Sequence, residues 1–123
     1  MQLDNEDMAN RTVKFYKNYF LDFFKSQPAS VQKKITQILV WISTIDRLPI
    51  STFKAIKTVQ GLFEIRIESG SNIFRVFCCF DEGERVILFN GFQKKTQKTP
   101  SNEIEKATKL MKEYFNEKNH GNK

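Results

Sequence analysis

Residues 62–90 read LFEIRIESGSNIFRVFCCFDEGERVILFN and decide the fold. The stretch contains three short segments rich in aromatic and β-branched residues, separated by glycine-containing turns: Leu62–Glu68, Ile73–Phe80 and Arg85–Asn90. A fourth segment of the same kind, Phe53–Val59, precedes them. The pattern predicts a run of antiparallel strands joined by hairpins.

The two turns predict how these strands pair. If Ser69–Asn72 forms a four-residue loop, Arg66 lies opposite Arg75 across the first hairpin. A two-residue turn at Glu82–Gly83 places Arg75 opposite Asn90 in the second hairpin. The register therefore predicts a polar row of Arg66, Arg75 and Asn90 on one face of the sheet.

The same register divides the remaining side chains between two faces. One face is wholly apolar, and we expect the helices to pack on it; it carries Phe63, Ile65, Ile67, Phe74, Val76, Cys78, Ile87 and Phe89. The opposite face contains the polar row and carries Leu62, Glu64, Arg66, Arg75, Phe77, Cys79, Val86, Leu88 and Asn90.

Two arginines directly opposite each other repel and destabilise a sheet. An anion between them would remove that cost, because guanidinium groups bind phosphate oxygens in a bidentate manner. The alternative is that Glu64 and Glu68 neutralise both arginines on an exposed face, since cross-strand ion pairs are common. Both interpretations stay open at this point.

Helical periodicity flanks the strands. Asn18 is expected to cap a helix that runs to about Ser26. A second helix begins near Pro28, which suits a first turn, and ends at Leu48–Pro49. A final helix opens at Thr99–Pro100, a capping residue followed by a first-turn proline.

These elements predict one α+β domain over residues 1–123. Thr12–Tyr16 forms a short first strand, an N-terminal helical hairpin packs on one face of a small, mainly antiparallel sheet, and the C-terminal helix joins it on that face. We expect residues 1–10 and 117–123 to be flexible, because Asn116–Lys123 reads as a polar tail.

Composition narrows the class of protein. Twenty Lys and Arg against fourteen Asp and Glu give a formal charge of +6, which favours polyanionic partners. No apolar run approaches the ~20 residues of a membrane span, and the acidic start MQLDNEDMAN is unlike a signal peptide. Cys78 and Cys79 are adjacent and poorly placed for a disulfide. We expect a reduced, cytoplasmic protein without membrane contact.

Cations gather at the end of the strand run. Arg85–Pro100 contains four cations and no acid, and Lys94, Lys95 and Lys98 follow the last strand closely enough to approach Arg75. With Phe77 and Phe92 beside them, these cations suit single-stranded RNA, whose phosphates pair and whose bases stack. The alternative is a solubilising loop. Lys54 and Lys57 either extend the patch or protect an edge strand.

The residue types for most other chemistries are missing from the sequence. The single histidine, His120, lies in the polar tail, so neither a histidine-based metal site nor a Ser–His or Cys–His pair is expected. The glycines mark turns rather than a phosphate-binding loop. We expect chemistry that needs no metal or cofactor and depends on Lys and Arg. Cleavage of RNA by its own 2′-hydroxyl qualifies, because cations stabilise the charge that develops on the phosphate.

Several motifs in the right order resemble the RelE/ParE superfamily, specifically its phage-derived HigB-like branch. They are GLFEIRI, FRVF, ILFNGFQKKTQKTP and EIEKA, and the resemblance covers about Lys54 to Phe115. It implies a compact RelE-like sheet with an N-terminal helical hairpin. It also implies the toxin of a type II toxin–antitoxin system, since many members cut mRNA in the ribosomal A site without metal.

The resemblance assigns roles to individual residues. Arg66 and Arg75 match the family's strand arginines, and Lys94 and Lys95 match the basic pair after the last strand, so these four are the expected catalytic set. The resemblance also matches Lys54 and Lys57 to lysines of the family. Together with the residues that the register and the composition indicate, the expected RNA-binding residues are Lys54, Lys57, Phe77, Asn90, Phe92 and Lys98. The sequence departs from the RelE pattern in having no C-terminal tyrosine or histidine placed as acid or base; Tyr114 falls on the packing stripe of the last helix. A lysine with a lowered pKa is the expected substitute.

Two other functions stay open. One is a ParE-like toxin that poisons DNA gyrase by binding, and the other is a non-toxic RNA-binding module. If the protein is a toxin of this kind, its expected partners are a cognate antitoxin, expected to be a helix-turn-helix protein, together with mRNA and the ribosome.

Overall fold

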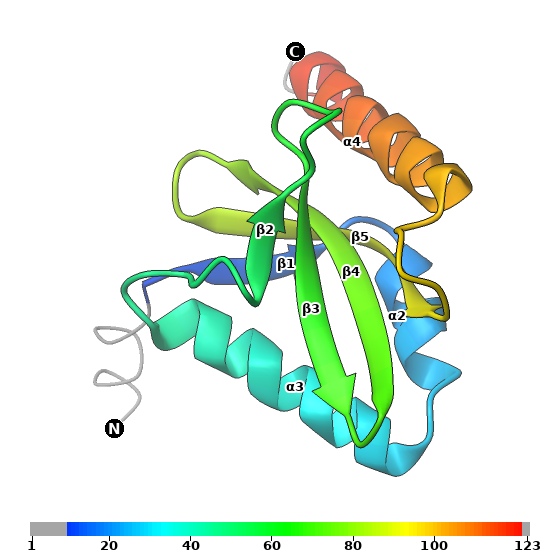
Figure 1. Cartoon of the computed structure of the whole chain (residues 1–123). Coiled ribbons are helices and arrows are strands. Elements are labelled where there is room, and N and C mark those ends of the chain that lie inside the picture. The colour runs from blue at the N-terminus through cyan, green and yellow to red at the C-terminus, as the bar shows by residue number, and fades with distance from the viewer. Residues whose placement is uncertain (1–9, 122–123) are drawn as a thin grey trace.

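The computed structural model describes residues 10–121, so the expectations for residues 1–9 and 122–123 lie outside the described part. Its elements are β1 (Thr12–Phe15), α2 (Tyr19–Lys25), α3 (Ala29–Thr44), β2 (Phe53–Ala55), β3 (Phe63–Ser69), β4 (Asn72–Asp81), β5 (Arg85–Lys94) and α4 (Ser101–Gly121). The five strands form one sheet in the order β1-β5-β4-β3-β2 (Figure 1). Only the β1–β5 pair is parallel, and the predicted α+β class with a mainly antiparallel sheet is confirmed.

The helices cover both faces of the sheet, which differs from the prediction of a single covered face. Helices α2 and α3 lie on one face and α4 lies on the other (Figure 1). The core under α2 and α3 contains Phe20, Val31, Ile35, Ile42, Phe53, Ile65, Ile67, Phe74, Val76, Cys78, Val86 and Leu88. The core under α4 contains Tyr16, Leu62, Phe77, Cys79, Ile87, Phe89, Phe92, Ala107 and Leu110.

The first hairpin has the predicted register, with Arg66 directly opposite Arg75. The second hairpin does not. Its turn has three residues, so Asp81 pairs with Arg85, and a bulge between Val76 and Cys78 shifts the register once more. Arg75 therefore pairs with Phe92 instead of Asn90.

The shifted register reverses the predicted faces of β5. Ile87 and Phe89 lie under α4, while Val86 and Leu88 lie under α2 and α3. A shift of one residue exchanges the two faces of a strand, because side chains alternate. Both faces are thus apolar over much of their area, and this is why each is covered by helix.

Gly91 lies where α2 packs closely on β5. A Cβ at this position would come within 2.6 Å of the Phe23 ring, so the position has no room for a side chain. The close approach fixes α2 against β5 just beyond the bulge.

The ends of several elements differ from the prediction. Residues 116–121, expected as a polar tail, continue α4 as helix. Strand β2 ends at Ala55, and β5 continues four residues beyond Asn90. Asn10, expected to be frayed, donates a hydrogen bond to the Thr44 carbonyl at 2.7 Å.

A polar cluster anchors the C-terminal half of α4 to β4. Asp81 is buried, and it accepts hydrogen bonds from the Tyr114 hydroxyl and, at 2.7 Å, from Lys118 Nζ. Burial by itself raises the pKa of Asp81, but the hydrogen bonds from Lys118 and Tyr114 outweigh it and lower that pKa below its usual 3.8. The ionised carboxylate is therefore part of what holds α4 in place.

Tyr114→Phe should lower the free energy of unfolding at pH 7 by about 1–2 kcal/mol, because it removes a hydrogen bond to a buried carboxylate. The pKa of Asp81 is lower in the folded protein, so this stabilisation is complete above about pH 4 and is lost as the pH falls through the folded value. Denaturant unfolding at several pH values measures the difference. Tyr19→Phe is the matched control, and a loss that does not change below pH 4 would contradict the role of Asp81.

Within residues 10–121, no helix combines the length and the apolar composition needed to cross a bilayer.

Candidate functional site

A cavity of about 940 Å³ opens on the face of the sheet that carries α4. Helix α4 packs over the far ends of β4 and β5 and leaves this face uncovered near the β3–β4 hairpin (Figure 1). The cavity is lined by six cations, and the single acid among its lining residues is Glu64; the cations are Lys54, Lys57, Arg66, Arg75, Lys94 and Lys98. We call this cavity the cationic cleft.

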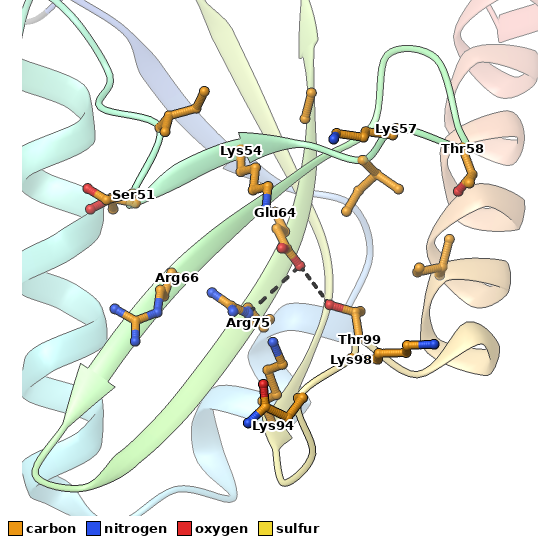
Figure 2. A pocket seen from close by; sticks show the side chains of 16 residues that line it. Ser51, Lys54, Lys57, Thr58, Glu64, Arg66, Arg75, Lys94, Lys98 and Thr99 are labelled. Carbon is orange, nitrogen blue, oxygen red and sulfur yellow. Dashed lines mark hydrogen bonds and ion pairs between the residues drawn. The ribbon is translucent and has the colours of Figure 1, made fainter.

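Neighbouring strands bring these side chains together. Lys54 on β2 pairs directly with Glu64 on β3, and Arg66 on β3 pairs with Arg75 on β4. Lys94 comes from the end of β5, where its backbone pairs with the β4 residue two positions before Arg75. Figure 2 shows Lys54, Arg75 and Lys94 gathered around Glu64. Six of the ten predicted site residues thus line one cavity.

Arg75 has the most confined guanidinium of the cleft, with a side chain that is 11% exposed. Burial lowers its pKa, the Glu64 carboxylate opposes that shift, and Arg66 adds to it. Among residues 10–121, its buried Nε has no hydrogen-bond partner, and Glu64 Oε1 lies 3.8 Å away, beyond hydrogen-bond distance. A buried donor without a partner costs stability, so this geometry favours an anion as the missing partner.

Arg66 is arranged differently. Its Nη2 donates a hydrogen bond of 2.7 Å to Glu68 Oε2, and its side chain is 34% exposed. The sequence left open whether glutamates or an anion balance the two arginines. Glu68 neutralises Arg66 directly, whereas Arg75 keeps an unpaired donor.

Lys94 lies in a strongly positive environment. Burial lowers its pKa, and the positive charges of Arg75, Arg66 and Lys54 lower it further, while Glu64 opposes them. A lysine with a lowered pKa releases its proton more readily. Lys94 is therefore suited both to hold a phosphate and to donate a proton.

Four predicted site residues do not line the cleft. Lys95 is exposed outside it. Phe77 and Phe92 stack on each other with ring centroids 5.7 Å apart and are buried under α4, so Phe77 offers no surface to a base. Asn90 is buried and donates hydrogen bonds to the carbonyl and the carboxylate of Glu103. The expected base-stacking role does not fit Phe77, because α4 covers the face on which it lies.

The structure adds two residues that the sequence did not place in the site. Glu64 is buried in the cleft, and the Thr99 hydroxyl donates to its Oε1 at 3.3 Å. The sequence placed Glu64 on the same face as Arg66 and treated it as an ion-pair partner. Thr99 was expected only as a helix cap, and its approach to β3 depends on the path of residues 95–100.

The cysteines lie in the core, away from the cleft. Cys78 and Cys79 are both free and buried. Burial raises the pKa of Cys78, and burial together with Asp81 raises that of Cys79 to about 12. Neither sulfur is therefore poised to react as a thiolate. Within residues 10–121, no three His, Cys, Asp or Glu side chains are grouped as metal ligands.

Comparison with known proteins places the chain in a family. Residues 22–112 match the family described as "Phage derived protein Gp49-like (DUF891)". No curated protein matches the sequence. The fold is similar to a chain of the crystal structure of the archaeal RelE-RelB complex from Pyrococcus horikoshii OT3, with a TM-score of 0.51, 14% identity, and coverage of 68% of this chain and 94% of that chain. The protein thus belongs to the phage-derived Gp49-like family and has a RelE-like fold.

Proposed function

We propose that this protein is the toxin of a type II toxin–antitoxin pair, of the HigB-like branch, and that it cleaves mRNA on translating ribosomes without a metal ion. The observation that carries the proposal is Arg75, whose confined guanidinium has an unpaired Nε in a cleft lined by five further cations. A phosphodiester is the anion whose oxygens match such a group.

The chemistry follows from where charge develops. The 2′-hydroxyl attacks the adjacent phosphorus, and the pentacoordinate phosphate that forms carries additional negative charge. Arg75 and Arg66, paired across β3 and β4, stabilise that charge from one side, and Lys94 approaches from the end of β5. Lys94 then donates a proton to the 5′-oxygen as it leaves. The products are a 2′,3′-cyclic phosphate and a 5′-hydroxyl.

Lys54, Lys57 and Lys98 line the rest of the cleft and are proposed to hold flanking phosphates. The expected base platform is not supplied by Phe77, which is buried. Tyr114 donates a hydrogen bond to Asp81 beneath the C-terminal half of α4, away from the cleft. The proton transfers are therefore assigned to groups that line the cleft.

The comparisons support the proposal at the level of fold and family. The similar archaeal structure is described as a RelE-RelB complex, and the matching family is phage-derived. By analogy we propose a cognate antitoxin, mRNA and the ribosome as partners, with mRNA as the substrate, and the cytoplasm as the place of action.

The proposal is tested by inducing the chain alone in a bacterial host and mapping the 5′ ends of cellular mRNA. We expect growth arrest with new 5′ ends inside coding regions. Growth arrest without new RNA ends, but with gyrase-dependent DNA breaks, would favour the ParE-like alternative. If the induced cells neither stop growing nor accumulate new mRNA 5′ ends, the proposed toxin function is wrong.

A further inference from the structure

Glu64 is the single acid among the residues that line the cationic cleft, and its side chain is 8% exposed. Cations line the same cleft from four strands: Lys54 from β2, Arg66 from β3, Arg75 from β4 and Lys94 from β5. Lys98 lines the same cleft from the segment before α4.

Two contacts fix the carboxylate of Glu64, and both involve Oε1. The Thr99 hydroxyl donates to Oε1 at 3.3 Å, and Arg75 Nε lies 3.8 Å from the same oxygen (Figure 2). In the described part of the chain, Oε2 makes no hydrogen bond, and the buried polar atoms without partners are Arg75 Nε and Asn90 Oδ1. Glu64 Oε2 is therefore open to the cleft.

The spacing from Arg75 argues against pure charge neutralisation. In the same sheet, Glu68 neutralises Arg66 through a hydrogen bond of 2.7 Å. Glu64 instead lies 3.8 Å from Arg75 Nε and leaves that donor unpaired. The carboxylate is held beside the guanidinium without occupying the position where an anion would bind.

We propose that Glu64 is the general base of the RNA cleavage proposed above, on which this inference rests. A phosphate held by Arg75 brings the 2′-hydroxyl of the ribose on its 5′ side next to Glu64, within the reach that a general base requires. Glu64 Oε2 takes the 2′ proton, the 2′-oxygen bonds to phosphorus, and the bond from phosphorus to the 5′-oxygen breaks. The 5′-oxygen receives its proton from Lys94. Solvent water then takes the proton from Glu64 and supplies one to Lys94, so that both groups regain their starting charge.

Glu64→Gln tests the assignment, because glutamine keeps the shape and the acceptor for Thr99 but does not take the proton. On ribosomes programmed with a synthetic message, kcat should fall by about 100- to 10,000-fold, the usual contribution of general base catalysis. Binding of the same message with 2′-deoxyribose at the cut site should be unchanged or tighter, because a negative charge is lost. Glu84→Gln, in the exposed β4–β5 turn, controls for net charge and should keep wild-type activity.

Glu64→Asp separates a base from a carboxylate that only balances the charge of Arg75. Glu64→Asp retains the negative charge beside Arg75 and so protects the fold. It should still be slowed at least tenfold, because the carboxylate is withdrawn from the ribose by one methylene group. An Asp variant with wild-type kcat would overturn the assignment.

A message with a 5′-thio leaving group at the cut site gives a second, independent test. Sulfur leaves without a proton, so Lys94→Met should recover most of its activity on this substrate while Glu64→Gln stays slow. Equal recovery of both variants would overturn the role of Glu64 as base. If the wild-type protein cuts no message, the proposed function itself fails; if it cuts and Glu64→Gln cuts equally fast, only the assignment of Glu64 fails.

Discussion

Arg75→Met should abolish growth arrest and slow message cleavage by about 100- to 1,000-fold, the usual cost of removing one donor that stabilises transition-state charge. Arg75 is 11% exposed and its Nε has no partner within the described residues, so its guanidinium has few interactions to lose except those with substrate. Methionine fills a similar volume without the charge. Cleavage rates on programmed ribosomes measure the effect, with circular dichroism to confirm the fold.

Lys33→Met is the matched control for this substitution. Lys33 is exposed on α3, on the opposite face of the sheet, and the change removes the same charge. It should leave toxicity and cleavage within about twofold of the wild type, since exposed charges this far away are screened by salt. A folded Arg75→Met protein as toxic as Lys33→Met would remove Arg75 from the site.

Lys94→Met should also cost about 100- to 1,000-fold in cleavage, whereas Lys95→Met should cost only a few-fold. The sequence predicted equal roles for the two adjacent lysines, but only Lys94 lines the cleft. Lys95 is exposed, so its contribution is limited to a long-range attraction that salt screens. Rates of the two variants at low and physiological salt measure the difference, and equal losses at both salt concentrations would contradict the assignment.

The register of the first hairpin was predictable because its turn is centred between Gly70 and Ser71. Ser69 pairs with Asn72, so the turn has two residues where a four-residue loop was expected, but the centre is unchanged and Arg66 lies opposite Arg75 as predicted. The cationic character of the segment after β5 was equally plain from its composition, and Lys94 and Lys98 do reach the cleft.

The second hairpin could not be predicted in the same way. One additional residue in its turn and one in the bulge near Val76 leave no signature in the alternation of apolar residues, because Val86, Ile87, Leu88 and Phe89 are all apolar. The sequence pattern therefore does not tell which β5 side chains lie under α4 and which lie under α2 and α3. The longer turn and the bulge determine this, and they also place Phe92 under α4.

The sequence did not predict Glu64 and Thr99 as residues of the site, for a related reason. Whether Glu64 is exposed or enclosed depends on where α4 begins and on how the preceding segment brings Thr99 to β3. Both are long-range properties that local periodicity does not encode. The burial of Phe77 could not be predicted for the same reason, because it depends on the helix that covers its face of the sheet.

The most direct test of the account uses a message with a single 2′-deoxyribose at the mapped cut position, presented on programmed ribosomes. We expect the all-ribose message to be cut there to a 2′,3′-cyclic phosphate or its opened 3′-phosphate, and the deoxy message to stay intact at that bond. Cleavage of the deoxy message at the same rate would contradict this expectation, because the cationic cleft would then serve a different nucleophile.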